Sequence, residues 1–188
     1  MICKWGDIIS LEYGKPIPDK SAVDGLVPVY GTNGPIGTSH LPPLCNYASV
    51  ILGRKGAYRG VHYCDQPFSV IDTAFYVKPK INDLDLRWVY YKFLTYDINR
   101  MDSGSAIPST DRYEIYSIAL ELPDLRTQVA VADTLAAIDE RIVNNSKVNH
   151  HLASRSATDS WPDIRRGSRT SRSSMSRRFS FVVLRIAS

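Results

Sequence analysis

Residues 124–154 read DLRTQVAVADTLAAIDERIVNNSKVNHHLAS and contain neither glycine nor proline. Because these two residues most often interrupt a helix, the stretch predicts one unbroken helix, with Asp124 as its N-cap. Thirty helical residues extend about 45 Å, which is longer than a domain of this size easily covers. The fold that follows from this stretch is a compact domain with a long helix behind it.

Apolar side chains recur along the predicted helix at steps of four, three and four residues, at Val131, Leu135, Ile138 and Ile142. The rhythm continues through Asn145 and Asn149 to Leu152, which makes a heptad seam with two polar positions. Polar residues at such positions fix register and partner. We expect a second helix to cover the seam. The dimerisation residues are then Val131, Leu135, Ile138, Ile142 and Asn145. The alternative is a single amphipathic helix that packs on its own domain.

Upstream of the helix, residues 1–123 are rich in Gly, Pro and Tyr and contain short apolar runs typical of strands. The expected strands are 48–52, its partner 61–64, 68–77 and 113–122. Residues 85–94 instead show helical spacing, with Asp83 or Asp85 as the cap. The expected apolar face consists of Leu86, Val89, Tyr90, Phe93 and Leu94. Strands and a helix in non-alternating order predict an α+β fold with mixed, mainly antiparallel strands.

The net charge of +4 comes from the end of the chain. The segment 155–188 contains eight arginines and two aspartates, so it carries +6 and leaves residues 1–154 at about −2. Its Arg/Ser-rich composition predicts a disordered or aberrant tail. The expected organisation is therefore a domain at 1–123, a long heptad helix at 124–154 and a tail at 155–188. Any nucleic-acid binding by the domain must come from local arrangement, not from bulk charge.

Cysteine usage and hydropathy favour a reduced, soluble, cytoplasmic protein that does not enter a membrane. Cys3, Cys45 and Cys64 are an odd number without a close pair or a CxxC, so no metal site is expected. The N-terminus has no apolar run of signal-peptide length, and no stretch approaches the length of a bilayer span.

Catalytic motifs are missing from the sequence. None of the eight lysines has an acid two residues before it, so the Asp/Glu-x-Lys part of a metal-dependent nuclease is not matched. A P-loop, a GxGxxG loop, an HExxH and a GxSxG are also absent. Residues 65–68, DQPF, approximate the loop with which adenine methyltransferases hold a flipped base, but no glycine-rich loop for a methyl donor accompanies them. We expect no catalytic residues and no cofactor.

Two glycine-rich stretches, 29–37 and 52–60, are the features of the domain that suit DNA binding. Glycine lets the backbone approach a partner closely and adopt positive φ. Arg and Lys can neutralise phosphate or contact guanine, and Asn can pair with adenine. The expected DNA-binding residues are Asn33, Arg54, Lys55, Tyr58 and Arg59. The alternative is a plain hairpin with solvated charges.

The order of several loose motifs resembles the target recognition domain of type I restriction–modification specificity subunits over about residues 5–152. Each motif is short, but their joint order is fairly specific. The motifs are Trp5, PVYGTNG at 28–34, LGRKG at 52–56, SGSAIP at 103–108, LPDL at 122–125 with Gln128, and LAAID at 135–139.

The resemblance implies a non-catalytic DNA-reading subunit. Such subunits usually carry two recognition domains separated by two long antiparallel helices, and each domain reads half of a bipartite target. Modification subunits hold the adenine methyltransferase, and a separate motor subunit translocates and cuts. With one domain and one helix, this chain resembles a half-length form, for which we expect a homodimer on an inverted-repeat target in double-stranded DNA. The alternative is a protein- or glycan-binding module with a dimerising helix and no DNA role.

Overall fold

The computed structural model describes residues 1–158 apart from positions 19, 21, 23 and 102–107, with side chains on the last helix up to Leu152. Most of the expected tail at 155–188 therefore lies outside the described residues. The chain forms two compact units, Met1–Asn145 and Ser146–Ser188. The first unit holds the sheets, the short helices and the first part of the last helix. In the second unit, the described residues continue that helix.

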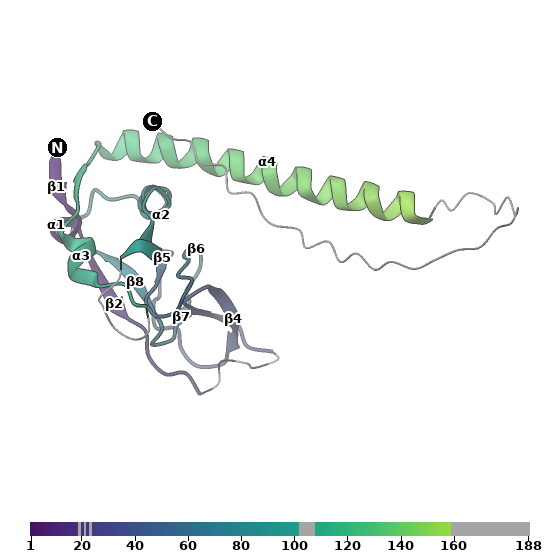
Figure 1. Ribbon diagram of the computed structural model, residues 1–188, viewed down its shortest axis with the longest axis horizontal. Helices are drawn as coiled ribbons and strands as arrows, with labels where there is room; N and C mark the ends of the chain where they lie inside the picture. The colour runs from purple at the N-terminus through teal and green to yellow at the C-terminus, as the bar shows by residue number, and fades with distance from the viewer. Residues whose placement is uncertain (19, 21, 23, 102–107, 159–188) are drawn as a thin grey trace, which may run out of the picture. The chain divides into compact units, whose positions relative to one another are not determined.

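The described elements mix strands and helices in the non-alternating order that the sequence predicts, so the α+β class is confirmed (Figure 1). In chain order they are β1 Ile2–Lys4, α1 Trp5–Ile8, β2 Ile9–Tyr13, β3 Val27–Gly31, β4 Gly34–Ser39, β5 Ser49–Gly53, β6 Val61–Cys64, β7 Ser69–Val70, β8 Ala74–Pro79, α2 Leu86–Phe93, a 3₁₀ helix at Ile98–Arg100, α3 Arg112–Ser117, β9 Ala119–Glu121 and α4 Leu125–Thr158.

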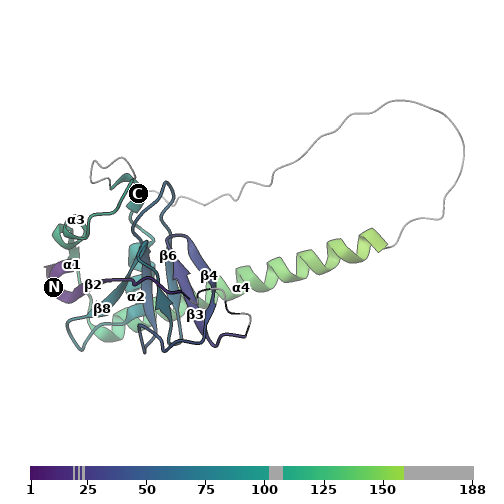
Figure 2. The same ribbon diagram turned by 90° about the horizontal axis from the view of Figure 1, so that it is seen from below.

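Three small sheets organise the first unit (Figure 2). The largest has the order β2-β8-β5-β6, the second has the order β4-β3-β7, and the third pairs β1 with β9. All pairings are antiparallel except β3 with β7. The predicted pairing of 48–52 with 61–64 is confirmed as β5 with β6, in the register Ser49 to Cys64.

Strand β5 is buried at all five positions because it has a core on each face. Successive side chains of a strand point to opposite faces. Val50 and Leu52 face the larger core, which also holds Trp5, Phe75 and Phe93. Ile51 faces the smaller core, whose other buried members are Cys45, Cys64, Phe68, Val70 and Ala74. A central strand covered on both sides gives the loop that follows it a rigid base.

Helix α2 confirms the predicted helix at 85–94, and Asp85 is the cap, because its carboxylate accepts from the Trp88 backbone N–H at 2.8 Å. The expected apolar face is met in part. Val89 and Phe93 are buried, whereas Leu94 caps the C-terminus and is exposed. Trp88, outside the expected set, is buried beside Trp5 in the larger core.

Two strand predictions need correction. The run 68–77 divides into β7 and β8, because a turn at Ile71–Ala74 moves the chain from the second sheet to the first. The prediction of a strand over 113–122 is wrong for its first half, where α3 forms and only Ala119–Glu121 is extended. The cause is Asp111, whose side chain accepts from the Tyr113 N–H at 2.9 Å and starts a helix.

Helix α4 confirms the prediction of one unbroken helix, and Asp124 accepts from the Thr127 N–H at 2.9 Å at its start. This backbone hydrogen bond, with a second from the Thr127 hydroxyl, holds the pKa of Asp124 below its usual value. Gln128 is fully buried, accepts from the Asp85 N–H at 2.9 Å, and donates to the Asp83 and Pro123 carbonyls. The start of α4 is thereby fastened to the loop before α2.

Candidate functional site

The connection between β5 and β6, residues 54–60, is the point at which the two glycine-rich stretches meet. We call it the β5–β6 loop. Its base is closed by the Gly53 N–H, which donates to the Gly60 carbonyl at 2.8 Å. The N–H groups of Arg54 and Lys55 donate to the Thr73 carbonyl at 2.9 and 3.1 Å. The loop is therefore held by backbone bonds at its base and against the turn between β7 and β8.

The turn between β3 and β4 supports the same loop. The Gly60 N–H donates to the Thr32 carbonyl at 2.9 Å, and a Cβ at Gly53 would overlap that carbonyl oxygen. Glycine at position 53 is thus required by the close approach of the two backbones. The arrangement brings the stretch 29–37 against the stretch 52–60.

A third segment, beginning at Pro108, lies against the other side of the loop. The Gly56 N–H donates to the Pro108 carbonyl at 3.0 Å, and the Thr110 N–H donates to the Arg54 carbonyl at 2.8 Å. Lys55 and Ser109 form an isolated antiparallel bridge. Positions 103–107 of the SGSAIP motif lie outside the described residues, but its last residue, Pro108, contacts the loop.

Most of the predicted DNA-binding side chains are accessible. Tyr58 and Asn33 are exposed, and Arg54 and Lys55 are partly exposed. Their chemistry is mixed: two cations, an aromatic ring and an amide that both donates and accepts. A surface of this kind can contact an anionic, hydrogen-bonding ligand.

Arg59 differs from the other predicted residues because its side chain is only 1% exposed. Its Nη2 donates to the carbonyls of Ile98, Asn99 and Met101 at 3.0, 2.8 and 2.8 Å. The Arg59 N–H also donates to the Asn99 side chain at 2.7 Å. Nη2 is therefore occupied by backbone of the 3₁₀-helix region, while Nε and Nη1 are buried without a hydrogen-bond partner among the described residues, and the guanidinium is out of reach of a surface ligand. It ties the β5–β6 loop to residues 98–101.

A cluster that the sequence did not indicate surrounds Arg54. Its guanidinium lies 4.7 Å from the ring centroid of Tyr13, and the Arg112 guanidinium lies 5.0 Å from the same ring. Arg112 also lies 4.9 Å from the Tyr113 ring centroid and donates to the Tyr113 hydroxyl at 2.9 Å. No local pattern could have found this group, because 98 residues separate Tyr13 from Arg112.

Among the residues that the structure describes, carboxylates do not pair with these cations. Within the described residues, ion pairs join Arg87 to Asp85 and Asp133, and Arg100 to Asp97, and none involves Arg54, Lys55 or Arg112. The β5–β6 loop and its neighbours therefore carry local positive charge although residues 1–154 are slightly acidic in sum.

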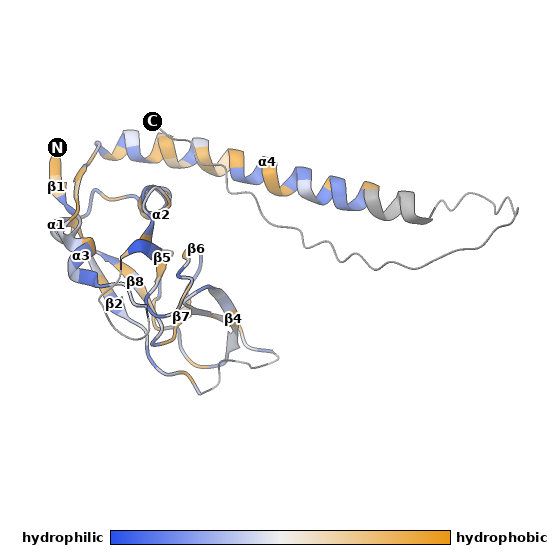
Figure 3. Cartoon of the chain, viewed as in Figure 1, coloured by the Kyte–Doolittle hydropathy of each residue, from blue (hydrophilic) through white to orange (hydrophobic). Residues whose placement is uncertain are grey.

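The predicted dimerisation residues lie on an open face of α4. Val131, Ile138 and Ile142 are exposed, as is Asn145, while Leu135 is partly buried. A neighbouring face of the helix contacts α2. There, Asp133 pairs with Arg87 at 2.8 Å, and Asp139 accepts from the Tyr91 hydroxyl at 2.8 Å. Figure 3 shows apolar positions recurring along α4 between polar ones. Among the described helices, none combines the length and apolar character needed to cross a bilayer.

Comparison with known proteins identifies the family of the chain and solved structures with a similar fold. The model of a family described as "Type I restriction modification DNA specificity domain" matches residues 2–152. No curated protein matches the chain in sequence.

Solved structures share the fold at low identity. The type I restriction–modification S subunit from M. genitalium is 17% identical with a TM-score of 0.64, over 82% of this chain and 44% of that one. A chain from a study of complex assembly and conformational transition of the type I R-M system is 12% identical with a TM-score of 0.61, over 82% and 42%. The HsdS subunit from Thermoanaerobacter tengcongensis is 12% identical with a TM-score of 0.56, over 79% and 39%. The matched region spans less than half of each of these chains.

Proposed function

The chain belongs to the family of type I restriction–modification DNA specificity domains, and from this premise we propose that residues 1–123 recognise a specific sequence in double-stranded DNA. The observation that carries the proposal is that three segments meet at the β5–β6 loop, whose backbone is held in place by hydrogen bonds. The cations of this loop have no carboxylate partners among the described residues. Loops on a rigid scaffold are the usual position of binding residues.

The contact residues in this proposal are Asn33, Arg54, Lys55 and Tyr58. Asn33, in the turn between β3 and β4, can pair with the edge of adenine, and Lys55 can donate to guanine O6 and N7 or to phosphate. Arg54 and Tyr58 flank them in the β5–β6 loop. Arg59 has a supporting role, because it orders the loop from inside.

The chain supplies recognition, and other subunits supply chemistry. We assign adenine methylation to a modification subunit and cleavage to a motor/nuclease subunit, in keeping with the missing catalytic motifs. The purified chain alone is therefore expected neither to methylate nor to cleave DNA, with no cofactor of its own. Transfer of a labelled methyl group to DNA by a preparation free of other subunits would contradict this assignment.

We propose further that two copies associate through α4, over the heptad positions of the helix that the sequence predicts at 124–154. The exposed Val131 and Ile138 support this, because apolar side chains at heptad spacing gain free energy when a second helix covers them. A two-fold pair presents the same reading surface twice in opposite directions. The target is then an inverted repeat whose half-sites lie about one DNA turn, or ~34 Å, apart.

The test is selection of duplexes by the full chain from a pool of random sequences. We expect enrichment of an inverted repeat, and affinity that falls linearly on a log–log scale with salt, by about 0.9 per phosphate contact. The double variant Arg54→Ala, Lys55→Ala should weaken binding. Lys78→Ala is the matched control, because Lys78 is exposed at the opposite end of β8 from the loop.

Two outcomes would defeat the proposal. If no sequence is enriched, the proposal that the domain recognises a specific DNA sequence is refuted. Binding that salt does not weaken would favour a protein- or glycan-binding module instead. An enriched site with two different halves would retain DNA recognition but exclude the symmetric homodimer.

A further inference from the structure

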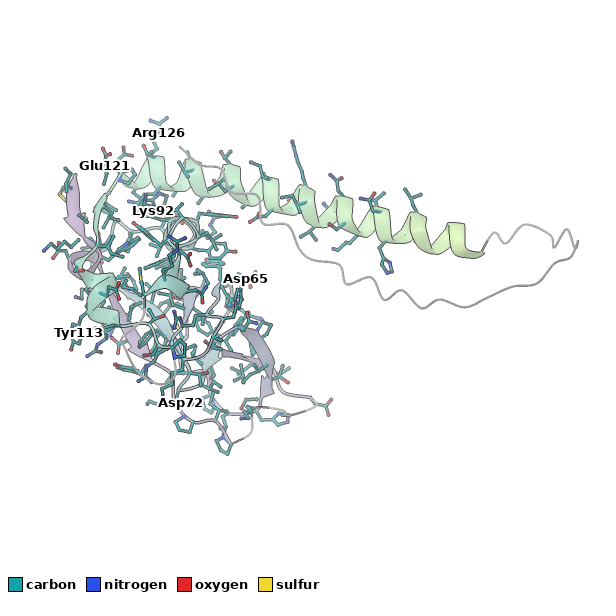
Figure 4. The ribbon with its side chains drawn as sticks, viewed as in Figure 1. Asp65, Asp72, Lys92, Tyr113, Glu121 and Arg126 are labelled. Carbon is teal, nitrogen blue, oxygen red and sulfur yellow. The ribbon has the colours of Figure 1, made fainter. Side chains whose placement is uncertain are left out.

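The ring of Tyr13 is contacted by two guanidiniums, those of Arg54 and Arg112, at 4.7 and 5.0 Å from its centroid. Arg112 also contacts the ring of Tyr113. We call these four residues the Tyr13 stack. Tyr13 and Tyr113 are 44% and 64% exposed, so the stack opens to solvent. Figure 4 labels Tyr113 at the margin of the first unit, on α3.

The chain builds the stack by joining three distant segments. Tyr13 ends β2, where it is paired with Phe75 of β8 in the sheet. Arg54 follows β5 and donates from Nη1 to the Asp72 carbonyl at 3.0 Å. The bond from the Thr110 N–H to the Arg54 carbonyl brings the start of α3 beside the loop. The position of the Arg54 guanidinium is thus set by a backbone carbonyl as well as by the ring, and that of Arg112 by the Tyr113 hydroxyl and the two rings.

The electrostatics of the stack call for an anion. Two guanidiniums share one ring although like charges repel, and no carboxylate among the described residues pairs with either. The Nε of Arg112 is buried and has no hydrogen-bond acceptor in the described structure. A bound anion beside the two cations would offset their mutual repulsion, whereas the buried Nε lies out of its reach.

We propose that the Tyr13 stack binds backbone phosphates of the DNA duplex and sets its position on the domain. This inference rests on the proposed DNA-recognition function and adds Tyr13, Arg112 and Tyr113 to its surface. Phosphate is favoured over a base because the stack offers two cations that no carboxylate among the described residues pairs with, and phosphate contacts are made chiefly by such charges. In Arg112 the Nε is buried and one Nη2 N–H donates to the Tyr113 hydroxyl, which leaves Nη1 and the second Nη2 N–H for phosphate oxygens. The Tyr113 hydroxyl can donate a further hydrogen bond.

The experiment measures binding of the full chain to its selected duplex and to a random duplex over a range of salt concentrations. Arg112→Gln should weaken both complexes by the same factor, about tenfold for one lost charge-assisted hydrogen bond. It should also lower the salt slope by about 0.9. Arg126→Gln is the matched control, because Arg126 is an exposed arginine at the start of α4 with no place in the stack (Figure 4). It should leave affinity and slope unchanged.

Three further variants keep the test decisive if Arg112→Gln lowers the melting temperature. Arg112→Lys keeps the charge but not the planar stack, so it should retain the slope while losing affinity. Tyr13→Phe keeps the ring and should bind as the wild type does, whereas Tyr13→Leu should weaken both duplexes alike.

The outcomes separate this inference from the function on which it rests. If the wild-type chain selects a sequence but Arg112→Gln changes neither affinity nor slope, the stack is structural and only this inference fails. If Arg112→Gln relaxes the preference at one base position and keeps the slope, the stack reads a base, which also overturns it. If the wild-type chain binds no DNA sequence, the proposed function fails and this inference fails with it.

Discussion

In the recognition domain Trp5 is fully buried and stacks on Phe93 at 4.5 Å between ring centroids, whereas on α4 the side chains of Ile138 and Ile142 are about half exposed. Both regions are rich in apolar residues at regular spacing. The domain satisfies its pattern within one chain, because β5 and α2 bring two layers together. A helix longer than the surface beneath it cannot do so. An apolar pattern therefore indicates burial, but not whether the covering surface belongs to the same molecule.

The largest effect is expected in the domain core. Trp5→Ala should lower the free energy of unfolding by about 3–5 kcal/mol, because it leaves a cavity beside Phe93 and Trp88. Denaturant unfolding of the full chain measures the change. Leu94→Ala, at an exposed position at the end of α2, should cost less than about 0.5 kcal/mol. Equal losses from both variants would mean that the core is not centred on Trp5.

The next effect tests the open face of α4. The double variant Ile138→Asp, Ile142→Asp should raise the dissociation constant of the proposed dimer at least about 100-fold, or roughly 2.7 kcal/mol, because carboxylates replace apolar contacts. Sedimentation velocity measures association. Ala137→Asp, Asn144→Asp places the same charges at exposed positions off the seam and should leave the dimer intact. A wild-type chain that is monomeric at micromolar concentration would refute the homodimer.

A smaller effect separates two arginines of the same loop. Arg59→Met should lower the free energy of unfolding by about 1–3 kcal/mol, because three carbonyls lose a buried donor. Arg54→Met removes partly exposed cation–π contacts with Tyr13 and Phe75 and an exposed hydrogen bond to the Asp72 carbonyl, and should cost about 1 kcal/mol or less. Thermal and denaturant unfolding compare the two. If Arg54→Met were the more damaging, the division between a supporting and a contacting arginine would be wrong.

The smallest expected effect is a pH dependence at His62. Burial lowers the pKa of this imidazole below its ordinary value, because the charged form loses hydration. Near and below pH 6.5 the unfolded chain therefore takes up a proton that the folded chain resists, so stability should decrease as the pH falls and be restored above that value. Unfolding at several pH values measures it. His62→Gln should flatten this part of the profile, and an unchanged profile would show that His62 is not responsible.

Local signals in the sequence account for much of the fold. The heptad spacing and the lack of Gly and Pro predicted α4, and the spacing and cap of residues 85–94 predicted α2. The error at α3 was avoidable, because Asp111 and Glu114 form the spacing of a helix-capping pair. The β-branched and aromatic run at 68–77 predicts extended chain but does not reveal that the chain changes sheets at Ile71.

The proposed binding surface could be predicted only in part from the sequence. Glycines at 53, 56 and 60 mark a loop that approaches other backbone closely, and the structure confirms this at Gly53, whereas a Cβ at Gly60 would meet the His62 side chain. The segments that meet at this loop are distant in the sequence. They are joined by backbone hydrogen bonds in which the carbonyls of Thr32, Thr73 and Pro108 accept from the loop. The Tyr13 stack needs contacts between residues that share no sequence neighbourhood.

By itself the sequence determined the class of the fold, the long helix and its seam, and the family motifs, because these depend on local propensity and on a repeat along one element. Only the tertiary structure decided that Arg54 opens to solvent while Arg59 is buried, although both are arginines of one short loop. The reason is physical. Burial depends on what the rest of the chain brings alongside a residue, and the carbonyls that surround Arg59 come from about 40 residues away.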